Sequence, residues 1–318
     1  MCKARKGLDR SQLIVCIGNR DCGYSMIELL IAASIGLIVI GFIHNIASKT
    51  LWIVEEVEAS AEVLESAQYL TGLLSREIGL AGFFGDFNTA NLPSSGAPDL
   101  CQLMNRAQVI KTMPYPIVGI DNVVSGYKLC NRDIILSGTD VMLLRRSKID
   151  QKSLSYKLQS QQIYIQGSFA HPNPIIDRGD NSAAFILMQG TKRKPVRAWQ
   201  QTLYYVSDDN IFKRRRFLKG RYLNSEPLVD GVQDFQVEYV VRKLDVTSEC
   251  GEDYLSAPLT DAQWKRVVAL RVHFLLRSSW QGQSQEGKQL NYANKTYDIS
   301  GDGYYELFKV LVPIMNKL

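Results

Sequence analysis

The sequence predicts an α+β protein in which one long N-terminal helix packs on an antiparallel β-sheet domain. Three observations support this prediction. A dense apolar run covers residues 26–43, a helical spacing of apolar residues continues to Ile78, and the segments after Thr139 alternate between apolar and polar side chains. Of the 318 residues, 46% are hydrophobic and 22% are charged, which is the composition of a chain that folds.

The first half of the predicted helix is apolar on all sides. From Met26 to Ile43 almost every side chain is apolar. A helix needs about 20 such residues to cross the hydrocarbon core of a bilayer. We therefore expect a single transmembrane segment over residues 24–46, roughly the length that this rule requires.

The second half is predicted to be amphipathic. Its apolar residues recur at intervals of three and four, while the glutamates face elsewhere. The predicted packing face consists of Leu51, Val54, Val57, Ala61, Leu64, Ala67, Tyr69 or Leu70, Leu74 and Ile78. A glycine cluster in GLAGFFG ends the pattern, so the helix is expected over residues 24–80.

The rest of the chain is predicted to be non-helical. Residues 81–138 are rich in Pro, Gly and Asn and are expected to be an irregular connection. Residues 139–318 contain short segments rich in β-branched and aromatic residues, without a recurring helical period, which favours an antiparallel β-rich domain. TLYYV and IFKRR, joined by SDDN, are predicted to form a hairpin.

Glu28 interrupts the apolar run near its start. A carboxylate at that depth is costly unless it lies among the headgroups or pairs with a cation, so it indicates a function. Gly23 stands five residues earlier, and basic residues precede that Gly. This arrangement resembles the class III signal of type IV prepilins and type II secretion pseudopilins. Tyr24 stands where that signal usually has Phe, and the leader is longer than most, so the true start codon is left open.

The resemblance implies a processing reaction and an assembly role. A prepilin peptidase would cut between Gly23 and Tyr24, which removes residues 1–23 as a leader, and would methylate the new amine on Tyr24. Glu28 would then align the subunit in a filament by pairing with a positive helix N-terminus. Further along, AGFFG, GTDVMLLRRS, the pair LVDGVQDFQVEYVV and WKRVVALRVHFLLRS, and the closing YYELFKVLVPIMN resemble the PilW family of type IV pilus minor pilins.

The charges predict an orientation. Five basic residues precede the apolar run, namely Lys3, Arg5, Lys6, Arg10 and Arg20, and only Lys49 follows it closely. The positive-inside rule then puts the N-terminus in the cytoplasm and the β-rich domain in the periplasm. The net charge of +5 falls to +2 once the leader, at +3, is removed, so charge gives no reason to expect nucleic acid as a partner.

Three cysteines would leave with the leader, and Cys101, Cys130 and Cys250 would reach an oxidising compartment. We favour a Cys101–Cys130 disulfide, with Cys250 either free or sharing the alternative pairings. The segment DISGDG resembles the start of a calcium loop, with Asp298, Ser300 and Asp302 as ligands, but Lys309 stands where a Glu belongs. A turn without a metal is the other interpretation, and no other metal site or cofactor is expected.

The expected function is therefore non-enzymatic. Only three histidines occur, and neither a catalytic triad nor a nucleophile motif is present in the sequence. The PilW resemblance implies a minor pilin of the inner membrane that helps to initiate type IV pilus assembly and reaches the pilus. Its partners would be other minor and major pilins, the prepilin peptidase and the inner-membrane assembly platform. The alternatives are a J-like pseudopilin of the type II secretion tip and, more distantly, a membrane-anchored periplasmic enzyme or ligand-binding protein.

Overall fold

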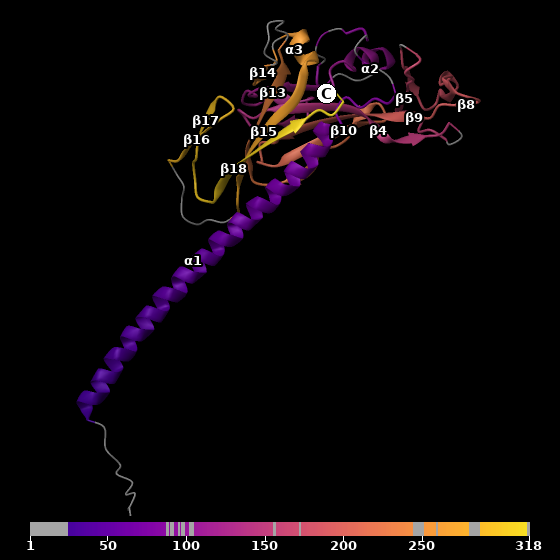
Figure 1. Cartoon of the computed structure of the whole chain (residues 1–318). Helices are drawn as coiled ribbons and strands as arrows, with labels where there is room; N and C mark the ends of the chain where they lie inside the picture. The colour runs from indigo at the N-terminus through magenta and orange to yellow at the C-terminus, as the bar shows by residue number, and fades with distance from the viewer. Residues whose placement is uncertain are drawn as a thin grey trace, which may run out of the picture. The chain divides into compact units, whose positions relative to one another are not determined.

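The computed structural model describes residues 25–316 except 87–88, 90–91, 95, 97–98, 102–104, 155–156, 172, 244–250, 259 and 280–286. The chain divides into two compact units, residues 1–53 and residues 54–318. One continuous helix, α1 (Met26–Gly79), contributes to both units and is drawn in indigo in Figure 1. The predicted helix of residues 24–80 agrees with α1 within two residues at each end.

The second unit contains an eight-stranded antiparallel sheet. Its spatial order is β1 (Ile117–Ile120), β4 (Val141–Lys152), β9 (Val196–Val206), β10 (Phe212–Leu218) and β11 (Arg221–Tyr222); β12 (Glu226–Val229) pairs with β10, and β5 (Ile163–Gln166) pairs with β9 and with β6 (Ile175–Arg178). The predicted hairpin is confirmed, because β9 and β10 pair from Val206 and Phe212 onward. Asn210 adopts a φ of 61° in its loop, a conformation that Asn tolerates well.

A second antiparallel sheet has the order β14 (Glu252–Leu255), β13 (Val232–Arg242), β15 (Val267–Arg277) and β18 (Tyr305–Pro313). The alternation predicted for β13 and β15 is present, since Phe235 lies opposite Phe274 and Tyr239 opposite Leu270, all four buried. The two Phe rings also contact Phe212 of β10 edge to face, with centroids 5.1 and 5.5 Å away. The two sheets therefore share one core.

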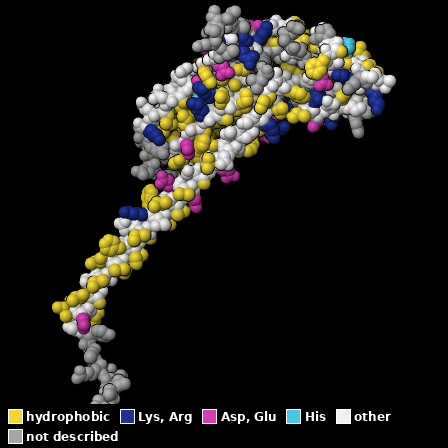
Figure 2. Space-filling model, in the orientation of Figure 1, with side chains coloured by type: hydrophobic (Ala, Val, Ile, Leu, Met, Phe, Trp, Pro, Cys, Tyr) yellow, Lys and Arg dark blue, Asp and Glu magenta, His cyan; other side chains and the backbone are white. Residues whose placement is uncertain are grey.

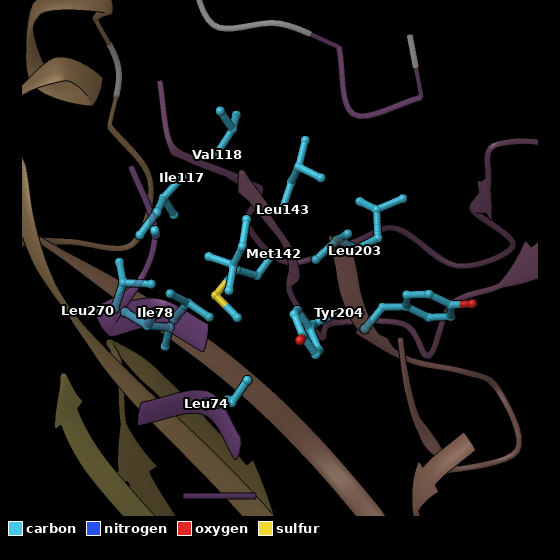
Figure 3. Close-up of a cluster of buried hydrophobic side chains, with 14 of the residues drawn as sticks. Leu74, Ile78, Ile117, Val118, Met142, Leu143, Leu203, Tyr204 and Leu270 are labelled. Atoms are coloured by element: carbon cyan, nitrogen blue, oxygen red, sulfur yellow. The ribbon is translucent and has the colours of Figure 1, made fainter. Parts of the chain in front are cut away.

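The C-terminal part of α1 closes that core. Leu74 and Ile78 are fully buried and lie beside Met142 of β4, Ile117 of β1 and Leu270 of β15 in Figure 3. The helix ends at Gly79, whose carbonyl accepts a hydrogen bond from the Met315 N–H at 3.2 Å. The chain thus places its first helix against its last strand.

The predicted packing face of α1 is wrong in its first part. The buried residues are Ala59, Val63, Ala67, Leu70, Leu73, Leu74, Ile78 and Gly79. The expected packing residues that are exposed instead are Leu51, Val54, Val57, Ala61 and Leu64. The sequence shows two apolar stripes in this stretch with side chains of similar size, so only the position of the sheets decides which stripe is buried.

The remaining elements are short. They are α2 (Arg106–Thr112), α3 (Asp261–Lys265), a 3-10 turn η1 (Ser182–Ala184), and the hairpins β2 (Lys128–Leu129) with β3 (Asp133–Ile134), β7 (Met188–Gln189) with β8 (Lys192–Arg193), and β16 (Gln289–Tyr292) with β17 (Lys295–Asp298). Residues 81–138, expected to be irregular, contain α2, β1 and the β2–β3 hairpin. These elements escaped prediction because they are too short to show a period.

Candidate assembly site on the long helix

The first half of α1 buries almost nothing. From residue 26 to residue 58 every residue except Gly36 and Ser48 is exposed. The large apolar side chains between Met26 and Val57 are 47% to 83% exposed. Figure 2 shows them along the start of the helix, with acidic side chains gathered further on. By length and composition this helix can cross a membrane.

Glu28 lies in the first turn of α1, where a negative charge opposes the positive end of the helix dipole. Its Oε2 accepts a hydrogen bond from the Ser25 backbone N–H at 3.3 Å. The side chain is exposed, so it can also accept a donor from another molecule. Gly23 and Tyr24, the predicted cleavage and methylation residues, lie outside the described residues.

The second half of α1 is fixed to the sheets by polar contacts as well as by its buried stripe. Glu77 accepts two hydrogen bonds from Arg146 Nη2, at 3.1 and 3.2 Å, and one from Nε at 3.3 Å. Both side chains are mostly buried, at 12% and 15% exposure. Glu62 accepts from the backbone N–H and the hydroxyl of Ser279, at 3.3 and 2.9 Å. Polar contacts therefore attach the helix to the rest of the domain at two positions, Glu62 and Glu77.

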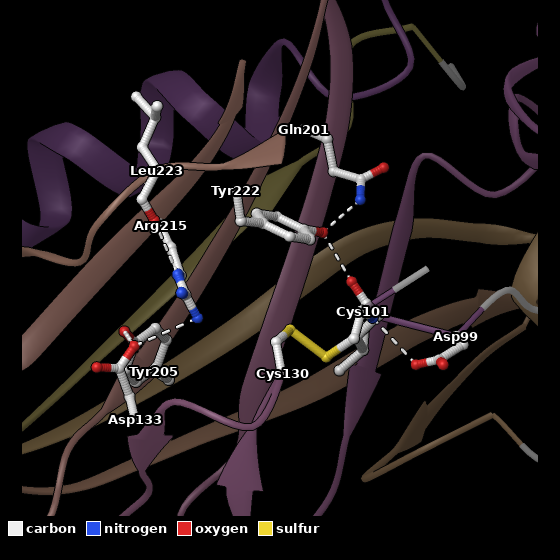
Figure 4. The surroundings of a disulfide bond; sticks show 10 residues. Asp99, Cys101, Cys130, Asp133, Gln201, Tyr205, Arg215, Tyr222 and Leu223 are labelled. Atoms are coloured by element: carbon white, nitrogen blue, oxygen red, sulfur yellow. Dashed lines mark hydrogen bonds and ion pairs between the residues drawn. A yellow bond between two sulfur atoms is a disulfide. The ribbon is translucent and has the colours of Figure 1, made fainter. Parts of the chain in front are cut away.

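Cys101 and Cys130 form a disulfide in the structure, with Cα atoms 5.2 Å apart. Figure 4 shows how the neighbouring residues tie this loop to the eight-stranded sheet. The Tyr222 hydroxyl donates to the Leu100 carbonyl at 2.7 Å and accepts from the Gln201 amide. Burial raises the pKa of Tyr222 to about 12, so its hydroxyl remains a donor. Cys250 lies outside the described residues.

Two buried arginines were not predicted as structural residues. Arg145 is fully buried and donates to the Gln201 side chain at 2.9 Å and to the Tyr115 carbonyl at 3.0 Å. Burial lowers its pKa to about 10, so it stays charged at neutral pH. Arg215 is also buried and lies 3.5 Å from Asp133. In the sequence, the burial of these arginines could have been indicated only by their position in strands that are covered on both faces.

Residues 202–316 match the model of the family described as Type IV Pilus-assembly protein W, or PilW. Over this region the chain is PilW-like. The matched residues include the whole four-stranded sheet, whereas α1 and the disulfide lie before them. The PilW resemblance noted in the sequence is thus confirmed over residues 202–316.

A type IV-like pilin from Thermus thermophilus is similar in structure. It is 13% identical, the similarity covers 80% of this chain and 96% of that one, and the TM-score is 0.37. A score of that size carries no argument about function. No curated protein matches the sequence.

The basic cluster at the start of the PilW-like region is neutralised within the fold. Arg214 and Arg216 point to the same side of β10 and both contact Glu226, at 2.7 and 3.1 Å. The Arg214 guanidinium holds the pKa of Glu226 below its usual range. Lys213 pairs with Asp209 at 2.9 Å. These ion pairs leave little positive charge here for a phosphate.

The predicted calcium ligands lie at the end of β17 and directly after it, in the PilW-like region. The Asp298 carboxylate accepts from the Gln289 side chain at 2.7 Å, and the Ser300 carbonyl accepts from the Tyr305 hydroxyl at 2.9 Å. Asp302 is exposed. Within the described part of the chain, no group of three or more His, Cys, Asp or Glu side chains is placed to hold a metal ion. The calcium site stays a prediction.

Proposed function

We propose that this chain is a minor pilin that takes part in initiating type IV pilus assembly. The observation that carries the proposal is the exposed apolar half of α1, which begins with Glu28 and belongs to the same chain as a PilW-like sheet domain. The exposed large apolar side chains between Met26 and Val57 need an apolar environment from outside the chain. A bilayer supplies it before assembly, and the helices of other pilins supply it in the filament.

Glu28 would act at the step between these two environments. In a bundle of apolar helices, the N-terminal amine and the positive helix end of one subunit need a negative partner. The exposed carboxylate of Glu28 on a neighbouring subunit meets that need, because within the described residues it accepts a hydrogen bond from Ser25 alone. We place the amine on Tyr24 after cleavage behind Gly23, with the N-terminus cytoplasmic and the sheet domain periplasmic.

Peptide mass spectrometry of the N-terminus tests the processing step. In cells with the prepilin peptidase we expect a methylated peptide that begins at Tyr24. The same peptide should be lost, and the leader retained, in cells without the peptidase. An intact leader in both strains, or cleavage at another position, would overturn the proposal.

A charge-removing variant tests the assembly step. Glu28→Val should still be cleaved and methylated, but its recovery in sheared pili should fall by about tenfold because the buried amine loses its counter-charge. Lys49→Gln is the matched control, since Lys49 is the one Lys or Arg of residues 26–54, and this variant should be recovered normally. Recovery in a secretion pseudopilus instead of the pilus would favour the J-like alternative.

A further inference from the structure

A small group of exposed side chains lies at one end of the eight-stranded sheet. We define it as the tip surface: Phe169, Ile186, Met188, Lys192 and Arg193. The β7–β8 hairpin carries its last three residues, with Met188 opposite Arg193. The loop after β5 carries Phe169, and Ile186 directly precedes the hairpin.

The tip surface is held in place by a buried glutamine. Gln166, at the end of β5, is fully buried, and its side chain accepts from the Leu187 N–H at 2.9 Å and donates to the Lys194 carbonyl at 2.7 Å. The Lys194 N–H in turn donates to the Leu187 carbonyl at 2.8 Å. The base of the hairpin and the start of the Phe169 loop are thereby joined.

The side chains of the tip surface point into solvent. Phe169 is 83% exposed, Ile186 64% and Met188 52%. Lys192 and Arg193 are exposed too, and neither forms an ion pair with the described residues. Large apolar side chains beside unpaired cations are typical of a contact surface and not of a solvated loop.

A complementary surface exists on α1. We define the outer face of α1 as Val54, Val57, Glu58, Ala61 and Glu65, which recur at helical spacing on the side opposite the buried stripe. All five are exposed. Glu58 and Glu65 make no hydrogen bond or ion pair with the described residues, in contrast to Glu62, which binds Ser279.

The charges of the two regions are opposite over a wider area. Residues 145–200 contain ten Lys and Arg against three Asp, and residues 54–79 contain six Glu against one Arg. Arg145 is buried and Arg146 pairs with Glu77, so these three side chains add to neither surface. The tip surface and the outer face of α1 each combine apolar side chains with two charges, positive on one and negative on the other. Such complementarity fixes the orientation of a contact and excludes like-charged partners.

We propose that the tip surface of one subunit docks on the outer face of α1 in a second copy of this chain. The proposal rests on the proposed function, because it describes how a pilin would meet its neighbour outside the apolar helix bundle. The two surfaces differ, so the contact is head-to-tail and leaves one free surface at each end of a pair, which allows further subunits to add. An anionic membrane would also suit the tip surface, but a second copy accounts for the acidic outer face of α1 as well.

A charge exchange tests this contact in the full chain in detergent micelles. Lys192→Glu with Arg193→Glu should weaken self-association by about tenfold or more, because two negative surfaces then meet. Glu58→Lys with Glu65→Lys should do the same. An equimolar mixture of the two double variants should restore association, because the reversed tip of one meets the reversed helix of the other. Restoration also shows that both variants are folded.

Lys219→Glu with Arg221→Glu is the matched control. Both residues are exposed on the same sheet, and the pair carries the same change of charge. This variant should associate as the unmodified chain does. A loss of association in the control equal to that of the tip variant, or no restoration in the mixture, would contradict the proposal.

Photo-crosslinking locates the contact. A photoreactive benzoylphenylalanine in place of Phe169 should give dimers joined to peptides within residues 54–69 of the second copy. The same replacement at Val124, which is 70% exposed elsewhere on the domain, should not. Cross-links to lipid alone, no dimer, or a dimer joined elsewhere would overturn the docking. If the methylated peptide beginning at Tyr24 is still found, the proposed function survives that failure.

Discussion

Residues 26–53 and residues 54–79 belong to one helix but stand in different relations to their surroundings. In the first part, apolar side chains are exposed on every side. In the second part, one stripe from Ala59 to Ile78 is buried among two sheets, and the glutamates are turned away from it or paired. The same secondary structure thus serves two purposes, and the distribution of apolar residues around it decides which.

The two parts of α1 are stabilised by different surroundings. Residues 54–79 are stabilised by their own chain, so substitutions there should change the unfolding of the sheet domain. Residues 26–53 receive no such support, so substitutions there should change insertion or assembly and leave that unfolding untouched. Variants in the two parts should therefore differ in their effect on the unfolding of the sheet domain.

The largest effect is expected at the buried stripe. Leu74→Ala should lower the free energy of unfolding of the sheet domain by about 3 to 5 kcal/mol, because it leaves a cavity beside Met142 and Leu270. Leu37→Ala, at a side chain that is 71% exposed, should change it by less than about 0.5 kcal/mol. Thermal unfolding followed by near-ultraviolet circular dichroism in detergent measures both. Equal effects would remove the distinction between the two parts of α1.

The disulfide should stabilise only the second unit. Cys101→Ser with Cys130→Ser opens a loop with a sequence separation of 29 residues, which should reduce the stability of the sheet domain by about 2 to 4 kcal/mol. The helical signal of residues 26–53 in micelles should stay constant at temperatures where the variant domain has unfolded. If reduction of the unmodified chain does not lower the unfolding temperature, the loop is held by its hydrogen bonds alone.

The pH dependence of stability should also come from the second unit. Asp140 joins the two sheets by accepting the N–H groups of Asn122 and Val237, at 2.9 and 2.7 Å, and burial raises its pKa to about 7. A raised pKa means that the folded state binds the proton of Asp140 more tightly than the unfolded state does. The stability that comes from this bound proton is therefore lost as the pH rises toward 7.

Relative to Asp140→Asn, the unmodified chain should therefore lose about 1.4 kcal/mol of stability per pH unit between about pH 4 and pH 7. Denaturant unfolding at a series of pH values gives this difference. Burial lowers the pKa of His273, but this histidine is present in both the unmodified protein and Asp140→Asn. Its effect therefore cancels in the difference between their stabilities. A stability difference between the two proteins that does not change with pH would contradict this prediction.

The smallest effect is expected at the ion pair between α1 and β4. A double-mutant cycle on Glu77→Gln and Arg146→Gln should give a coupling energy of about 1 kcal/mol, because both groups are mostly buried and bonded at two atoms. The pair of Arg76 and Glu77, with Arg76 68% exposed and a separation of 3.9 Å, should couple by less than about 0.5 kcal/mol. A stronger coupling in the exposed Arg76–Glu77 pair than in the buried Glu77–Arg146 pair would show that solvent screening does not decide these coupling energies.

Much of the fold could be predicted from the sequence because its signals are local. The bounds of α1, the hairpin of β9 and β10, and the alternation in β13 and β15 each follow from a period of side chains along one segment. Even there, a register shift between Val240 and Val241 places Val267 opposite Val241, where simple alternation favoured Val268. An extra residue in one strand leaves no mark in a pattern of apolar residues.

Local patterns in the chain are enough to predict an apolar helix before an antiparallel β-rich domain, and they single out Glu28 as the acid at the start of that helix. Which stripe of α1 is buried depends on the packing of the sheets, since Val57 and Val63 are the same residue type and differ in what lies against them. The tertiary structure likewise decided that Arg145 and Arg215 are buried while Lys192 and Arg193 are exposed. Side-chain chemistry gives the cost of burial, but the partners that offset it come from strands distant in the chain.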